Sequence, residues 1–130
     1  MYSYPPPPRP LALRAFYVLL ALSRRELHVY ALRGALLNDS LGTVRVSIGQ
    51  LYPLITQLHD EGLIDMLRPK PAGKSGRERV HYRLSKYGEL RLKEEFQRLD
   101  HAMKIGEVAG LLDNEVPAEI ERLLLGLEER

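Results

Sequence analysis

The fold of this 130-residue chain is decided by residues 47–64, which read SIGQLYPLITQLHDEGLI. Ser47 is a typical helix N-cap, because its hydroxyl can accept a hydrogen bond from a backbone amide of the first turn. Gly62 suits the residue that follows a helix C-terminus, and a strand can begin directly after it. A single apolar stripe at helical spacing would face a core, formed by Ile48, Leu51, Ile55 and Leu58.

Pro53 complicates the start of this helix. In a helix that begins at Ile48, Pro53 would remove the hydrogen bond to the carbonyl of Gly49. We therefore expect either a regular helix that begins nearer Tyr52, or a first turn that is irregular.

A basic, glycine-rich hairpin follows the helix at once. Two short strands are expected at residues 64–68 and 79–84, with residues 69–77 as the loop between them. In the second strand Val80, Tyr82 and Leu84 alternate with Arg79, His81 and Arg83, which predicts one buried face and one exposed basic face. Between residues 68 and 83 the only anion is Glu78, against six cations: Arg68, Lys70, Lys74, Arg77, Arg79 and Arg83.

A helix that leads into a positively charged hairpin is the way a winged helix-turn-helix holds DNA. The helix face opposite the apolar stripe is uncharged, and glutamine can read base edges in the major groove. On the helix, the candidate DNA-binding residues are Ser47, Gln50, Tyr52, Pro53, Thr56 and Gln57, and on the wing they are Lys70, Lys74, Arg77 and Arg79. The wing cations suit phosphate contacts or insertion into the minor groove. The competing interpretation of the helix residues is an ordinary solvated face, and that of the wing is an ordinary solvent-exposed turn.

The remaining helices point to a second chain. Residues 11–23 are apolar on all sides, which predicts burial both by the domain and by a partner. A second helix is expected at about residues 26–37, a long one at about 86–112 capped by Ser85, and a last one from Pro117 to Leu127. Because little of the chain is left to cover these apolar stripes, a symmetric homodimer is expected. The candidate dimerisation residues are Leu19, Leu92, Phe96, Leu99, Met103 and Leu123.

Composition excludes several classes of function. The chain has no cysteine, so disulfides, cysteine-based zinc sites and thiol nucleophiles are excluded. The four histidines lack the spacing of a metal site, and no phosphate-binding loop or serine nucleophile elbow is present. We therefore expect that the protein is not an enzyme and that it binds neither a cofactor nor a metal. Without an apolar run long enough for a membrane helix or a signal peptide, we expect a cytoplasmic protein that does not enter membranes.

Charge and proline content divide the chain into three regions. Residues 1–85 carry 12 Lys and Arg against 6 Asp and Glu, whereas residues 86–130 carry 7 against 11. Nucleic acid would therefore meet the first part, and the acidic second part would be free for dimerisation. Residues 1–10 contain the run Pro5–Pro8, which predicts an extended arm. This arm could be a plain surface segment, a proline-rich ligand for another protein, or a segment that brings Arg9 to a DNA groove. The expected regions are this arm, a DNA-binding domain at 11–85 and a dimerisation region at 86–130.

Together these motifs resemble the PadR family of bacterial transcriptional regulators. Residues 49–54, GQLYPL, are similar to the family signature Gly-x-Leu-Tyr-Pro-hydrophobic, and residues 58–64, LHDEGLI, to the Leu-x-x-x-Gly-Leu-Ile that follows. Residues 27–32, LHVYAL, resemble Leu-His-Gly-Tyr-x-hydrophobic, while Gly76-Arg77 and residues 82–85, YRLS, resemble the block of wing and helix start. The match covers residues 11–93.

The resemblance implies a fold, a partner and a role. The fold would be mainly α with a small β-hairpin, a winged helix-turn-helix followed by C-terminal dimerisation helices. The role would be that of a homodimeric repressor on a palindromic double-stranded operator, associated with the bacterial nucleoid when bound. The chain departs from the family pattern at Val29, which replaces glycine, and at His81, which replaces an aromatic residue. It also lacks the tryptophan on which drug-binding members stack planar ligands.

Two other functions remain open at this point. The winged helix could instead be a protein-interaction module, or the dimer cleft could hold a small-molecule effector and make the chain a ligand-responsive sensor. DNA binding is the interpretation that the basic wing favours, and whether a small-molecule effector controls it stays open.

Overall fold

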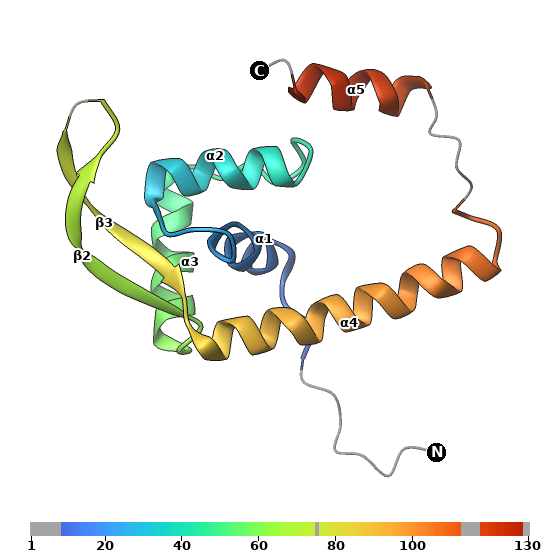
Figure 1. Cartoon of the computed structure of the whole chain (residues 1–130), viewed down its shortest axis with the longest axis horizontal. Helices are drawn as coiled ribbons and strands as arrows, with labels where there is room; N and C mark the ends of the chain where they lie inside the picture. Colours follow the sequence, from blue (N-terminus) through green and yellow to red (C-terminus); the bar gives the residue numbers. More distant parts are fainter. Residues whose placement is uncertain (1–8, 75, 113–117, 129–130) are drawn as a thin grey trace, which may run out of the picture.

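The computed structural model describes residues 9–74, 76–112 and 118–128. Helices dominate and one small antiparallel sheet completes the fold (Figure 1). In chain order the elements are α1 (Leu13–Leu22), β1 (Leu27–His28), α2 (Val29–Asp39), α3 (Ile48–Asp60), β2 (Ile64–Ala72), β3 (Arg77–Leu84), α4 (Lys86–Val108) and α5 (Ala118–Glu128). The predicted fold class, mainly α with a small β-hairpin in a winged helix-turn-helix, is confirmed.

Helix α1 lies at the centre of the core. Its apolar side chains pack against α2 on one side and against α4 and β3 on others, so the predicted two-sided burial comes from within the chain. Leu19 is fully buried and Leu92 of α4 is 4% exposed. Both are among the predicted dimerisation residues, and in the single chain both side chains are buried in its own core.

Helix α3 begins where its cap predicts. The Ser47 hydroxyl accepts from the Gln50 amide at 3.1 Å, and the Gln50 side-chain oxygen accepts from the Ser47 amide at 3.0 Å, which forms a capping box. The helix runs through Pro53, so of the two expected starts the one at Ile48 is correct. Gly62, at φ +78°, ends the helix, and the amide of the next residue donates to the Leu58 carbonyl at 2.9 Å.

The sheet has a third strand that the sequence pattern did not predict. Strand order is β1-β3-β2, and the two residues of β1 pair Leu27 with Tyr82 and His28 with His81. The second helix therefore begins at Val29 rather than at residue 26, because residues 27 and 28 belong to the sheet. His81 was expected on the exposed face of β3 but is 8% exposed, because β1 lies beside it.

The wing strands are longer than expected. Strand β2 continues to Ala72 and β3 begins at Arg77, so most of the predicted loop is paired strand. The register shifts between Leu67 and Lys70, across Pro69, whose nitrogen has no hydrogen to donate to the ladder. Because β2 is an edge strand, it tolerates this proline.

Helix α4 is fixed to the end of α3 by its first turn. Ser85 caps α4 by accepting from the Gly88 amide at 3.0 Å, and its hydroxyl donates to the Gly62 carbonyl at 2.6 Å. A Cβ at Gly88 would overlap the carbonyl oxygen of Leu63. The last part of α4 extends away from the domain, and α5 lies apart from it (Figure 1). Pro117, the predicted first residue of the last helix, lies outside the described residues.

The segment before α1 is tied to the middle of α4. The Leu11 amide donates to the Glu95 carboxylate at 3.0 Å, and Arg91 donates to the Arg9 carbonyl at 2.9 Å. Burial alone would raise the pKa of Glu95, but the hydrogen bonds from Leu11 and Arg98 and the nearby arginine charges hold that pKa below its usual value. Of the predicted N-terminal arm, residues 1–8 lie outside the described part of the chain.

Candidate nucleic-acid interface

The exposed face of α3 carries every residue predicted to meet bases. Leu51, Ile55 and Leu58 are buried, which turns the opposite side of the helix outward. That exposed side holds seven uncharged residues, Ser47, Gly49, Gln50, Tyr52, Pro53, Thr56 and Gln57, and ends at the carboxylates of Asp60 and Glu61. A neutral face of small, amide and hydroxyl side chains can approach base edges without displacing an ion.

Two of the predicted base readers already make hydrogen bonds. The Gln50 oxygen serves the capping box, so its Nε2 donors are what it would present to a base. The Gln57 Nε2 donates to Glu61 at 3.1 Å. A base contact by Gln57 would therefore have to replace that bond.

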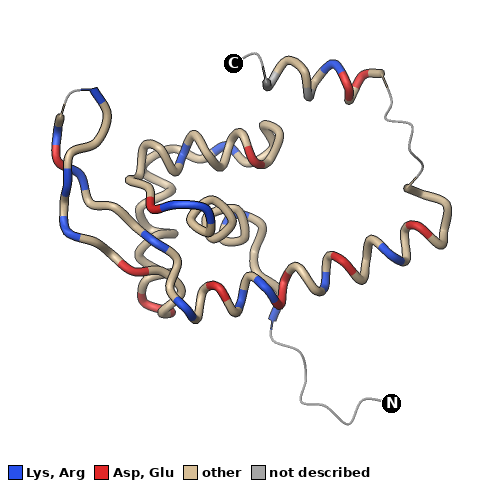
Figure 2. Tube along the Cα trace, viewed as in Figure 1, with Lys and Arg blue, Asp and Glu red and all other residues tan. Residues whose placement is uncertain are grey.

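The wing carries cations along both strands and at its tip (Figure 2). Lys74 and Arg77 lie beside the turn, in exposed positions. Lys70 forms an ion pair with Glu26, from the turn before β1. The guanidinium carbon of Arg79 lies 4.2 Å from the centre of the Tyr30 ring, in a cation–π contact. The four wing residues thus share one hairpin but differ in how the body of the domain holds them.

Two arginines of this surface were missed by the sequence argument. Arg33 of α2 and Arg45 of the turn between α2 and α3 line a hollow of about 270 Å³, together with Tyr30 and Val46. The Arg45 Nε donates to the Gly42 carbonyl at 3.2 Å. In helix-turn-helix proteins the helix before the recognition helix crosses the DNA backbone, so arginines at these positions could have been proposed as phosphate contacts.

A pair of histidines lies under the base of the wing. The rings of His28 and His81 meet edge to face at 5.4 Å, and His28 Nδ1 accepts from the Ala31 amide at 3.4 Å to cap α2. Desolvation lowers the pKa of His28, and the charges of His81 and Arg79 lower it further. The neutral ring is the form that can cap the helix. In the part of the chain that the structure describes, no three histidine or carboxylate side chains are grouped to hold a metal.

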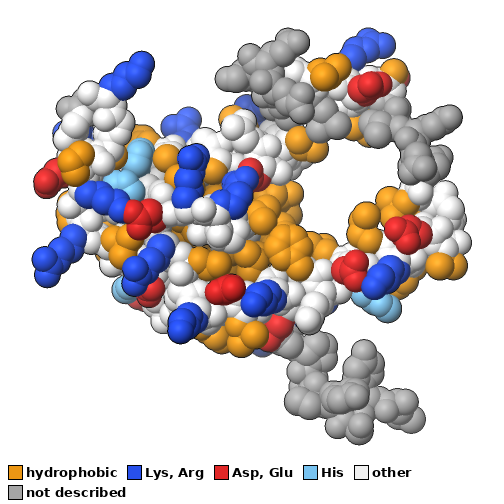
Figure 3. All heavy atoms as spheres, in the orientation of Figure 1, with side chains coloured by type: hydrophobic (Ala, Val, Ile, Leu, Met, Phe, Trp, Pro, Cys, Tyr) orange, Lys and Arg blue, Asp and Glu red, His pale blue; other side chains and the backbone are white. Residues whose placement is uncertain are grey.

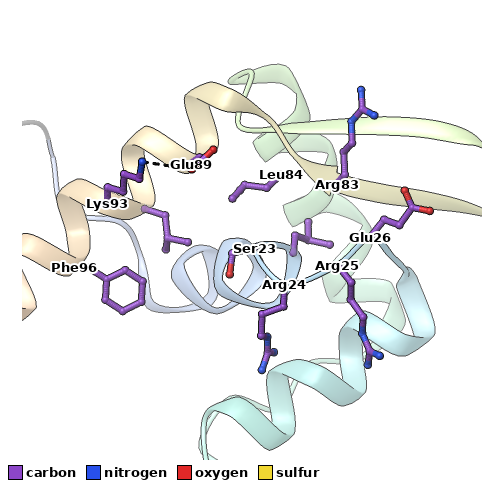
Figure 4. Close-up of a pocket in the computed structure, with 11 residues that line it drawn as sticks. Ser23, Arg24, Arg25, Glu26, Arg83, Leu84, Glu89, Lys93 and Phe96 are labelled. Carbon is purple, nitrogen blue, oxygen red and sulfur yellow. Dashed lines mark ion pairs between the residues drawn. The ribbon is translucent and has the colours of Figure 1, made fainter.

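A surface hollow of about 570 Å³ lies between the α1–β1 turn and the first half of α4 (Figure 4). Its floor is apolar, from Leu22, Leu92 and Phe96. Three of its four cations are paired with carboxylates: Arg24 with Asp39, Arg83 with Asp65 and Lys93 with Glu89.

The far part of α4 exposes large apolar side chains. Phe96 is 44% exposed, Leu99 42% and Met103 52%, and Leu123 of α5 is also exposed. Figure 3 shows apolar side chains along this helix and on the body beside it. No helix in residues 9–74, 76–112 and 118–128 is both long and apolar enough to cross a membrane. Such an apolar stripe on a helix exposed to water is typical of a protein interface.

The model of the transcriptional regulator PadR-like family matches residues 18–94, more than half of the chain. The match spans the winged helix and the first turns of α4. The chain belongs to this PadR-like family.

Solved structures share the fold over most of their length. A PadR-like transcriptional regulator from Bacillus cereus is 28% identical, with a TM-score of 0.58 over 78% of this chain and 92% of that one. A Streptococcus transcriptional regulator is 25% identical, with a TM-score of 0.61 over 74% and 90%. The circadian clock associated protein Pex from anabaena is 25% identical, with a TM-score of 0.55 over 75% and 86%. A search of curated proteins found no match.

Proposed function

We propose that this PadR-like regulator binds a double-stranded operator as a homodimer and acts as a repressor. The observation that carries the proposal is the exposed face of α3, uncharged from Ser47 to Gln57, beside a wing lined with cations. In this arrangement α3 enters the major groove, and Gln50, Tyr52 and Thr56 contact base edges and the adjoining phosphates. Lys74, Arg77 and Arg79 contact phosphate or the minor groove, which supplies affinity that does not depend on sequence.

The proposed division of labour follows the charge distribution. Residues 11–85 form the DNA-binding domain, and residues 86–130 form the acidic dimerisation region, which phosphate repels. A two-fold dimer presents two copies of α3, so its operator would be palindromic.

The test of the proposed function is fluorescence anisotropy of a labelled generic duplex at two salt concentrations. We expect a dissociation constant of about 10⁻⁴–10⁻⁶ M at physiological salt and a steep loss of affinity as salt rises, because phosphate contacts release counterions. If no duplex binding occurs even at low salt, the proposal is wrong and a protein-interaction module is the better interpretation.

Charging the apolar stripe of α4 is expected to separate the two copies. Leu99→Asp with Met103→Asp would place two carboxylates in a face that two copies must desolvate. Light scattering coupled to size exclusion should give twice the 14.9 kDa chain mass for the wild type and a single chain mass for the variant.

Leu90→Asp is the matched control for that experiment. Leu90 is 52% exposed on the same helix, but its position is turned away from the stripe of Phe96, Leu99 and Met103. This variant should remain a dimer. A dimer that survives the double substitution would place the interface elsewhere.

A further inference from the structure

Tyr30 lies where the wing meets the body of the domain. It is in the first turn of α2, directly after the short strand β1, and its ring is 47% exposed. The Arg79 guanidinium covers that ring at 4.2 Å. Because β1 pairs with β3 through His28 and His81, the start of α2 is held next to the part of β3 that carries Arg79.

The backbone of Arg79 is held as well as its side chain. The His81 Nδ1 lies 2.9 Å from the Arg79 carbonyl oxygen, so the ring can donate to it. The His81 ring meets the His28 ring, which in turn lies 6.4 Å from the Tyr30 ring. The Arg79 carbonyl is held by His81 and the Arg79 guanidinium is held by the Tyr30 ring. The side chain between these two contacts therefore has few conformations.

Stacking on Tyr30 leaves the binding groups of Arg79 available. A guanidinium uses its flat face against an aromatic ring, while its five N–H donors point outward in the plane of the group. An arginine already held in one conformation loses less entropy when it binds a phosphate. Tyr30 also lines the hollow with Arg33 and Arg45, next to Val46 and the N-terminus of α3. The stacked Arg79 thus lies on the same side of the domain as the start of α3.

We propose that Tyr30 is a positioning residue, which holds Arg79 in place for a DNA backbone phosphate between the wing and the start of α3. This inference rests on the proposed DNA-binding function and adds a role that the wing sequence does not suggest. Lys70 provides the contrast on the same hairpin. It is held by the carboxylate of Glu26, which neutralises its charge instead of leaving it available.

A double-mutant cycle in duplex affinity tests the inference. Tyr30→Leu should weaken binding by about 2- to 5-fold, the range expected for an exposed cation–π contact. Tyr30→Phe keeps the ring and should stay within about twofold of the wild type, since stacking needs no hydroxyl. In an Arg79→Ala background, Tyr30→Leu should have no further effect, because the group that it positions is gone. Tyr87→Leu, at a tyrosine of similar exposure on α4, should leave affinity unchanged.

A second measurement needs no DNA. In the wild type the ring current of Tyr30 should shift the NMR signals of the Arg79 side chain upfield, and the shift should persist in Tyr30→Phe and vanish in Tyr30→Leu. The melting temperatures of the variants show whether the domain stays folded.

Three results would overturn the inference: additive losses in the cycle, a loss in Tyr30→Phe as large as in Tyr30→Leu, or an unshifted Arg79 signal in the wild type. A wild-type chain that binds no duplex, yet shows the shifted Arg79 signal, would refute the proposed function and with it the role of Tyr30. Duplex binding that is insensitive to Tyr30→Leu would refute only the present inference.

Discussion

Replacing Arg77 and Arg79 together with alanine is expected to weaken binding to every duplex, random or specific, by about 10- to 100-fold near physiological salt. Each arginine that contacts a phosphate releases about one counterion, so the slope of affinity against salt should fall by about 2. Both residues lie on the wing and neither is in the core, so the variant should remain folded. Anisotropy titrations over a salt series measure both quantities.

Lys70 and Glu26 provide the matched controls for this prediction. Because Glu26 already neutralises Lys70, the Lys70→Ala variant should lose much less affinity than the arginine variant. Glu26→Gln should bind more tightly than the wild type and with a steeper salt dependence, since it frees Lys70 and removes a negative charge. If the arginine variant has an unchanged salt slope, the wing does not contact phosphate.

Gly88→Ala is expected to destabilise the protein by at least about 3 kcal/mol, at the upper end of the cost of overpacking. The added methyl would overlap the Leu63 carbonyl oxygen and lie 2.8 Å from a Leu84 methyl group. The first turn of α4 would have to move away from the end of α3, which strains the hydrogen bond from the Ser85 hydroxyl to the Gly62 carbonyl. Urea denaturation followed by circular dichroism gives the change in the free energy of unfolding.

Gly34→Ala is the control with the opposite sign. Gly34 lies inside α2 and an added methyl would have no atom within 4 Å, so only helix propensity changes. Alanine should therefore stabilise the protein by about 0.5–1 kcal/mol. Similar effects of the two substitutions would mean that α4 is not packed against Leu63 as the structure has it.

The elements that could be predicted from the sequence are those with a local signal. Ser47 and Ser85 predict the starts of α3 and α4, and each forms the predicted side-chain cap. Strand β1 has no such signal, because two residues carry no periodicity and their pairing with β3 joins distant parts of the chain. The same pairing buries His81, which alternation alone placed on the surface. For Leu19, an apolar pattern on all sides of a helix predicts that the side chain is buried, but not which chain covers it.

In the candidate DNA-binding site, too, local features could be predicted and contacts between distant residues could not. The exposed face of α3 follows from its 3.6-residue period, so its candidate residues could be chosen from spacing alone. The contacts of Lys70 with Glu26 and of Arg79 with Tyr30 join residues far apart in the sequence, so no spacing rule could find them. These contacts show that Lys70 is neutralised and that Arg79 is held in place. Composition alone could not distinguish these two cations.

The ties from Leu11 and Arg9 to α4 have a consequence for synthesis on the ribosome. Helix α1 is made before α4, yet its cover on one side consists of residues of α4 near Leu92 and Glu95. At about 5–20 residues per second, the most apolar helix of the domain waits several seconds for that cover. We expect the nascent chain to expose the α4-facing side of α1 throughout this interval, which makes that side a candidate binding site for a chaperone during translation.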